Sequence, residues 1–193
     1  MNFLNKKIFI IFSIVVIILI IIFVLINKKI KIGNNITSQE KVNNILNLNS
    51  YKATVEVNIK SNKNENKYII KQKYKKDQYL EQEVVEPSNI SGVKIIKQGT
   101  NLKIENTKLN LKSIFEGYKE ITENELDLIT FINNYKSNEK STMKNNKESI
   151  ILETKNSTLY INKKSGKPEK MEIRDTNKKV SIYILYREVD VNR

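Results

Sequence analysis

The chain has 193 residues, a formal net charge of +13, and no His, Cys or Trp. This composition excludes thiol nucleophiles, histidine bases, disulfides and zinc sites built from His or Cys, and leaves oxygen-bound ions such as Mg²⁺ or Ca²⁺ as the remaining metal option. We expect no metal and no cofactor. Ile, Lys and Asn supply 89 of the residues, a bias typical of an AT-rich genome, so part of the positive charge carries no information about partners.

A long apolar run lies near the start of the chain. It extends from Ile8 through Ile17 to Ile26, has 19 residues and is apolar except for Ser13. As a helix it would span about 28 Å, close to the hydrocarbon thickness of a bilayer. The run is longer than the apolar part of a signal peptide, and no small-residue cleavage site follows it. The sequence therefore predicts an uncleaved, single-pass transmembrane anchor over residues 1–27.

The charges around this run leave its orientation nearly balanced. Lys6 and Lys7 precede it and three lysines follow it closely, so the positive-inside rule decides little. A short tail before a long domain is nevertheless typical of an exported signal anchor. We expect a linker over residues 28–36 and an extracytoplasmic domain over residues 37–193, held at the cell membrane or a spore-envelope membrane.

Two helices are predicted in this domain. Thr37-Ser38-Gln39-Glu40 forms a capping box before a narrow apolar stripe, which predicts a helix over residues 38–48. Thr122-Glu123-Asn124-Glu125 forms a second capping box and predicts a helix over residues 123–135.

Most of the remaining domain alternates with the period of β-strands. Strands are predicted over residues 51–60, 67–76, 79–86, 93–98, 102–105, 109–111, 149–155, 158–162, 170–175 and 180–189. The polar segment 137–147 is predicted as a loop. Because a flat sheet of this size would curl, the sequence predicts an α+β fold, in which a curved antiparallel sheet forms an open half-barrel capped by helices and preceded by the transmembrane helix.

One face of the first predicted strand is apolar without interruption. Its residues are Tyr51, Ala53, Val55, Val57 and Ile59. The second helix offers Leu126, Ile129 and Ile132 on a face that could cover the same concavity. We predict that these eight residues form a face for an apolar ligand or a protein partner. A cavity of several hundred Å³ lined by Val, Ile and Leu would favour a lipid, whereas a filled core would favour protein docking.

Two other kinds of site fit the sequence less well. Glu81 and Glu83 share a strand face, but nothing indicates the cleft and opposed carboxylates of a glycosidase. Basic residues interleave with tyrosines at Lys71, Lys73, Lys75, Lys76, Tyr68, Tyr74 and Tyr79. This mixture occurs in single-strand nucleic-acid binders, yet no nucleic-acid motif accompanies it, and an anionic polymer or phospholipid would suit a basic face better. We therefore expect neither catalysis nor a nucleic-acid partner.

Two segments resemble the LolA-like superfamily. Residues 160–175, with the turn Gly166-Lys167-Pro168, resemble its C-terminal hairpin, and residues 85–96 are similar to its central hairpins. Over residues 40–191 the chain looks most similar to clostridial germination lipoproteins of the GerS type.

This resemblance implies a half-barrel whose apolar concave face holds acyl chains, or a scaffold that docks a protein such as a cortex-lytic amidase. A tethered chain could not carry cargo between membranes, so the predicted anchor favours a non-catalytic docking scaffold of the envelope. The alternative is a lipid-binding or envelope-sensing protein related to lipoprotein carriers.

Overall fold

The computed structural model describes residues 36–61, 64–117, 126–175, 177 and 179–192. The chain divides into two compact units, Met1–Thr37 and Ser38–Arg193, and the second contains every helix and strand that the structure describes.

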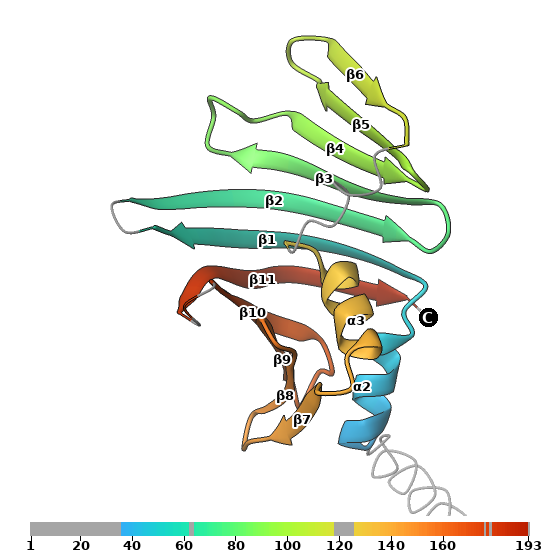
Figure 1. Ribbon diagram of the computed structural model, residues 1–193, viewed down its shortest axis with the longest axis vertical. Coiled ribbons are helices and arrows are strands. Elements are labelled where there is room, and N and C mark those ends of the chain that lie inside the picture. Colours follow the sequence, from blue (N-terminus) through green and yellow to red (C-terminus); the bar gives the residue numbers. More distant parts are fainter. Residues whose placement is uncertain (1–35, 62–63, 118–125, 176, 178, 193) are drawn as a thin grey trace, which may run out of the picture. The chain divides into compact units, whose positions relative to one another are not determined.

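The second unit is built on one antiparallel sheet of eleven strands (Figure 1). The first six are β1 (Ser50–Lys60), β2 (Glu65–Lys75), β3 (Tyr79–Glu86), β4 (Val93–Gln98), β5 (Asn101–Asn106) and β6 (Leu111–Phe115). The last five are β7 (Thr142–Asn145), β8 (Ser149–Glu153), β9 (Ser157–Asn162), β10 (Pro168–Arg174) and β11 (Val180–Asn192). The strand order is β6-β5-β4-β3-β2-β1-β11-β10-β9-β8-β7, so the last strand lies beside the first in the middle of the sheet.

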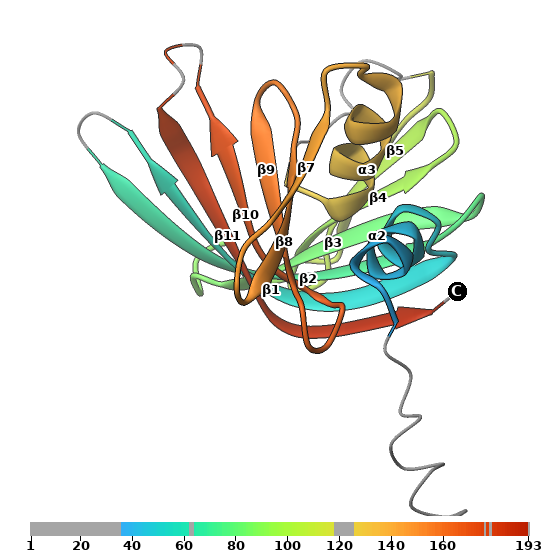
Figure 2. The same cartoon turned by 90° about the horizontal axis from the view of Figure 1, so that it is seen from below.

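The sheet is strongly curved, and two helices cover part of its concave face (Figures 1 and 2). These helices are α2 (Ser38–Leu46) and α3 (Leu128–Ser137). We call β1 and β7–β11 with the two helices the closed half, and β3–β6 the open half; β2 lies between them. This division matters because most of the apolar side chains that pack with the helices belong to the closed half.

The core lies between the helices and the closed half. It takes alternate residues of each strand, as expected where one sheet face is covered. Completely or almost completely buried apolar residues are Val42, Ile45, Val55, Val57, Leu128, Phe131, Ile150, Leu152, Leu159, Ile161, Met171, Ile173 and Ile184. The open half adds only Leu80 and Leu102 to the buried apolar residues.

Helix α2 is fixed to the closed half by its apolar stripe and by one polar contact. Val42 and Ile45 are buried one turn apart. One turn before Ile45, Lys41 Nζ donates a hydrogen bond to the carbonyl oxygen of Lys163 in the turn between β9 and β10. Gly166 completes that turn with φ +71°, and a Cβ there would come within 3.3 Å of Lys41 Cγ. Glycine therefore permits both the left-handed backbone and the close approach of the helix.

Three local predictions are corrected by the structure. The cap of α3 is Asp127, whose carboxylate accepts from Thr130 N at 2.7 Å, so the helix begins later than predicted; the box at 122–125 lies outside the described residues. Leu109 lies in a turn closed by the Asn106 side chain, which moves the strand to Leu111–Phe115. The predicted loop 137–147 contains β7, a short polar edge strand that carries almost no hydrophobic periodicity.

The predicted fold class is also corrected at its first element. Among the residues that the structure describes, no helix has the length and apolar character needed to cross a membrane. The predicted span from Ile8 to Ile26 lies outside those residues, so the transmembrane helix is no part of the fold found here. Helices α2 and α3 have 9 and 10 residues, which corresponds to about 14 and 15 Å, half of a bilayer core.

Candidate functional site

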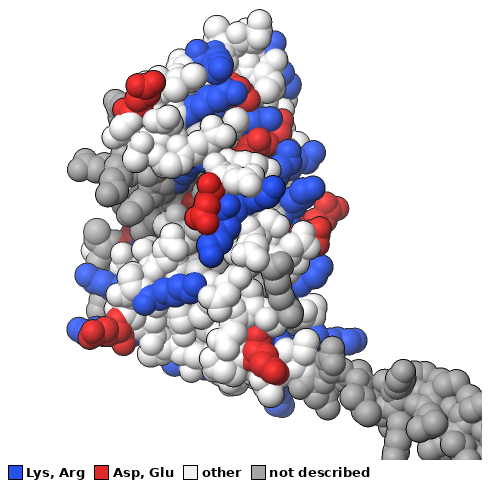
Figure 3. All heavy atoms as spheres, turned by 90° about the vertical axis from the view of Figure 1, so that its right-hand side faces the viewer, with Lys and Arg blue, Asp and Glu red and all other residues white. Residues whose placement is uncertain are grey.

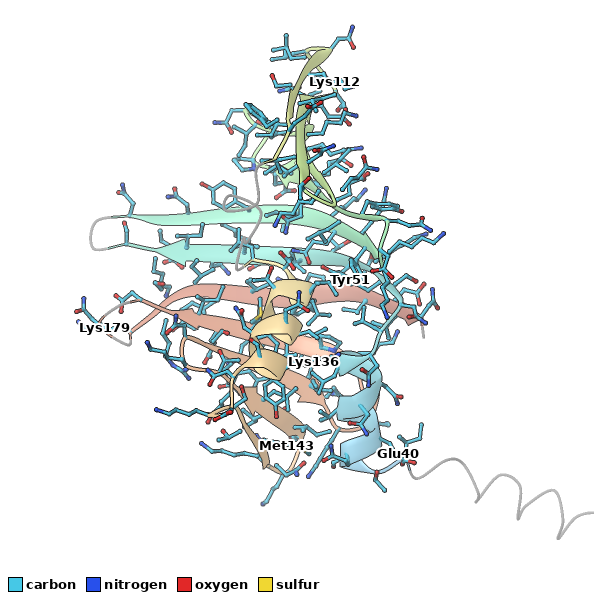
Figure 4. The ribbon with its side chains drawn as sticks, turned by 45° about the vertical axis from the view of Figure 1, so that its right-hand side comes forward. Glu40, Tyr51, Lys112, Lys136, Met143 and Lys179 are labelled. Carbon is cyan, nitrogen blue, oxygen red and sulfur yellow. The ribbon has the colours of Figure 1, made fainter. Side chains whose placement is uncertain are left out.

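The structure gathers all eight residues of the predicted face into one apolar cluster. Tyr51, Ala53, Val55, Val57 and Ile132 are buried in it, and Ile59, Leu126 and Ile129 pack against it from partly buried positions. The pairing of β1 with β2 and β11 explains this grouping, since residues opposite one another share a sheet face. Helix α3 lies over that face, as Figure 4 shows around Tyr51.

Side chains fill most of the space between this face and the helices. The pocket that Ile129 and Ile132 line with the end of α2 has a volume of about 140 Å³, below the roughly 300 Å³ at which small-molecule sites begin. Two larger hollows, of about 320 and 690 Å³, are lined mainly by charged and polar residues such as Lys71, Glu188 and Lys140. The first pocket is too small for an acyl chain, and the two larger hollows carry charged side chains in their lining.

The few polar atoms inside the cluster form a short chain of hydrogen bonds. Tyr51 Oη donates to Gln72 Oε1 at 3.2 Å, and Gln72 Nε2 donates to the carbonyl oxygen of Leu126 at 2.9 Å. This chain ties β1 and β2 to the segment that leads into α3. Among the described residues, the buried Tyr186 Oη has no hydrogen-bond partner.

Burial also determines the protonation of this region. It raises the pKa of Asp127, although the hydrogen bonds from Thr130 and the nearby Lys97 oppose the rise. Burial first, and then the Asp127 charge, raise the pKa of Tyr51 and of Tyr186. Both phenols are therefore kept neutral, and the Asp127 carboxylate is already used as the helix cap.

The described residues contain no group of three or more acidic residues that could hold a metal ion. Glu81 and Glu83 do share the convex face, as predicted, but both lie within ion-pairing distance of Lys94, at 3.6 and 3.8 Å. Carboxylates paired with a lysine in this way link neighbouring strands through ion pairs, and they do not form an unpaired couple of acids.

On β2 the predicted lysines and tyrosines separate onto opposite faces, whereas Tyr79 of β3 pairs with Lys75 and shares its face. Lys71 pairs with Thr54 on the convex face, whereas Tyr68 and Tyr74 pair with Val57 and Tyr51 on the concave face. A base stacked on these tyrosines would therefore lie on the side of the sheet away from Lys71. Figure 3 shows that Lys and acidic side chains alternate over the upper part of the molecule instead of forming one basic surface.

The open half has the feature that the sequence analysis missed. Leu109, Leu111 and Ile114 are the large hydrophobic residues that the structure leaves exposed, at 65%, 61% and 55%. They lie on β6 and on the turn before it, at one edge of the sheet. A signal was present in the sequence, because Leu111 and Ile114 flank Lys112 in a strand-like segment, but exposure cannot be read from a segment that short.

Solved structures, but no family model and no curated protein, match this chain. An uncharacterized conserved protein from Thermus thermophilus is 12% identical with a TM-score of 0.53, over 81% of this chain and 88% of that chain. At this identity the likeness shows a shared fold alone.

Two further matches are looser in geometry. One is to the structure of the CwlD amidase from Clostridioides difficile in complex with the GerS lipoprotein, at 27% identity and a TM-score of 0.49, over 79% of this chain and 94% of that chain. The other is to the LolA superfamily protein NE2245 from Nitrosomonas europaea, at 11% identity and a TM-score of 0.42, over 81% and 94%. Structures of a LolA superfamily protein and of the GerS lipoprotein are thus among the matches, in agreement with the predicted resemblance, and they show no family for this chain.

Proposed function

We propose that this chain is a non-catalytic docking module that holds a protein partner through the open half of its sheet. The observation that carries the proposal is the exposure of Leu109, Leu111 and Ile114 at the β6 edge. Leu111 and Ile114 lie on opposite faces of β6, so a partner that covers both must approach along the outer edge of the strand. Lys108 and Lys112 are exposed beside them, so apolar and basic side chains alternate along this edge.

The filled core supports protein docking over lipid binding. The eight residues of the predicted face contact each other and the two helices, and the pocket beside them measures about 140 Å³. An acyl chain would have to displace α3, together with the buried Phe131 and Leu128. The lipid-carrier alternative therefore requires a second conformation, whereas docking at the open half does not.

The partner that we propose is an envelope protein, with a cortex-lytic amidase as the first candidate. That candidate comes from the sequence resemblance to germination lipoproteins. The match to the complex of CwlD with GerS names such a pair, but its TM-score of 0.49 is too low to carry an interface to this chain. An envelope location belongs to the same proposal.

A binding measurement between the full chain and purified candidate amidase tests this function. We expect the double variant Leu111→Asp and Ile114→Asp to weaken binding at least tenfold. The matched control is Asn145→Asp with Asn146→Asp, which adds the same charge to exposed positions beside β7, at the opposite edge. Equal loss in both variants would mean that charge alone, and not the open half, governs binding, and an unchanged affinity in the first variant would refute the proposal.

A further inference from the structure

The outer edge of β6 is a strand position without a neighbouring strand in the described part of the chain. β6 pairs with β5 through all five of its residues, from Leu111 with Asn106 to Phe115 with Leu102, and it ends the strand order. Backbone N–H and C=O groups along such an edge can pair with another extended segment. The opposite edge, β7, has four residues and presents Thr142, Lys144 and Asn145 to solvent, which is the usual protection of an edge.

The pairing with β5 assigns the β6 side chains to the two sheet faces. Phe115 lies opposite the buried Leu102, so Leu111 and Phe115 belong to the concave face. Lys112 and Ile114 then point to the convex face. A strand added at this edge would meet apolar groups at Leu111, Ile114 and Phe115 and a single cation at Lys112, which Figure 4 shows on β6, remote from the helices.

The charges near this edge favour an acidic segment. Residues 93–115 contain five lysines and one acid, Glu105. That acid is paired with Lys103 and also lies opposite Lys112 in the β5–β6 register. Lys94 and Lys97 are within ion-pairing distance of acids outside this segment, on β3 and at the start of α3, so Lys108 and Lys112 are the described lysines nearest the edge without such a pair. Within the described residues, Lys112 has no carboxylate within 4 Å. A carboxylate placed opposite Lys112 would give a favourable cross-strand pair, and a lysine there would be repelled.

We propose that β6 accepts one extended segment of the protein partner as a twelfth, antiparallel strand, and that the segment carries an acid facing Lys112 between apolar residues. This inference rests on the proposed docking function and specifies its mode. Antiparallel addition continues the pattern of the whole sheet and gives the slightly more stable pairing. Along its own direction, the added segment has two apolar residues, a small polar residue, an acid and an apolar residue. These face, in that order, Phe115, Ile114, Ser113, Lys112 and Leu111.

Two other occupants fit the edge less well. A second copy of the chain would bring its own Lys108 and Lys112 against this edge, so that like charges would lie close together. An anionic bilayer would satisfy Lys112 and the apolar side chains, but lipid offers no partners for the backbone groups at the outer edge of β6. An extended acidic peptide is complementary to the side chains and to the backbone together.

Synthetic peptides titrated into the full chain test the proposal. The probe is acetyl-Glu-Leu-Val-Thr-Glu-Ile-Glu-amide, whose central Thr faces Ser113 and whose next Glu faces Lys112. We expect Lys in place of that Glu, or Pro in place of the Thr, to weaken binding at least tenfold. The Lys112→Glu chain should reverse the preference and select the Lys peptide. Equal binding of the Pro peptide, or no reversal, would overturn strand addition.

A second measurement keeps the test valid if Lys112→Glu unfolds the chain. Because the protein has no cysteine, Ser113→Cys creates a single thiol on β6. With oxidised glutathione added as the oxidant, peptides with one Cys at successive positions should form a disulfide with the chain fastest when that Cys replaces the central Thr. Crosslinking at the same rate for every position would contradict a fixed register.

The remaining outcomes separate this inference from the docking function. If the chain self-associates and the peptide inhibits this, a second copy would be the occupant. If the peptide does not bind but phosphatidylglycerol vesicles do, and Leu111→Asp abolishes that binding, a lipid surface would be the occupant. Loss of amidase binding in the Leu111→Asp and Ile114→Asp variant without peptide binding would reject strand addition and retain docking. Peptide binding to the natural chain, with unchanged amidase binding in that double variant, would retain strand addition and reject docking at the open half.

Discussion

The closed and open halves belong to one continuous sheet but are stabilised in different ways. In the closed half, strands β8 to β11 bury alternate apolar residues against α2 and α3. In the open half, β4 and β6 contain no buried residue, and pairs of opposite charge connect the strands on the convex face. The difference indicates that stability comes mainly from the closed half, while the open half, held by backbone pairing, is available for contacts with other molecules.

The largest contrast is expected from the same truncation in each half. Leu159→Ala removes a side chain that is 0% exposed in β9, and such deletions cost about 2–5 kcal/mol. Leu111→Ala, at 61% exposure in β6, should change the free energy of unfolding by less than about 0.5 kcal/mol. Urea denaturation of both variants measures the contrast. A cost above about 1 kcal/mol for Leu111→Ala would show that the open half contributes to the core after all.

Overfilling the closed half should have the next largest effect. Ala53 is 7% exposed and packs in the cluster under the helices, so Ala53→Leu should cost about 1–3 kcal/mol through overpacking. The melting temperature should fall, while partner binding at the open half stays unchanged. If the variant kept its stability and lost binding, the face under the helices would be a functional cavity.

A smaller effect is expected in the pH dependence of stability, through one carboxylate on the convex face of the closed half. In the closed half, hydrogen bonds and ion pairs from Arg187, Asn58 and Lys67 lower the pKa of Glu56 from 4.5 to about 2. A lowered pKa means that this stabilisation is present above pH 4.5 and is lost as the pH falls toward 2. Since Lys67 and Arg187 are each 57% exposed, solvent screening limits the effect to about 1 kcal/mol.

The variant Glu56→Gln should flatten this part of the pH profile. Its free energy of unfolding, measured by denaturant titration between pH 2 and pH 6, should change less with pH than that of the natural chain. Glu83→Gln in the open half is the control. It also removes one carboxylate, but the ion pair that it breaks is the longer one with Lys94, at 3.8 Å. An identical pH slope in the natural chain and in Glu56→Gln would contradict the role of this carboxylate.

The smallest expected difference concerns two glycines in turns. Gly166 and Gly99 both have positive φ, +71° and +58°, so alanine is strained at either position by about 1 kcal/mol. A Cβ at Gly166 would also press on Lys41, whereas nothing lies within 4 Å at Gly99. We expect Gly166→Ala to cost a few tenths of a kcal/mol more than Gly99→Ala in matched melting curves. The reverse order would indicate that α2 is held loosely against the β9–β10 turn.

The local pattern of the sequence was sufficient for much of the closed half. The alternation from Tyr51 to Ile59 predicted β1 and the side that faces the core, and the capping box at Thr37 predicted the first helix close to its observed bounds. These predictions succeeded because side-chain period and helix capping depend on residues only a few positions apart. The absence of His and Cys likewise needs no structure to exclude their chemistry.

Only the tertiary structure decided which surfaces are covered. Glu56 occupies a polar position of β1 and is nevertheless buried, because Lys67 reaches it from the next strand, β2, and Arg187 reaches it from β11, 131 residues along the chain. Leu111 and Ile114 are apolar and remain exposed, because β6 ends the strand order and neither helix reaches it. Strand order and helix coverage result from pairings between distant segments, and periodicity within one segment contains no information about them.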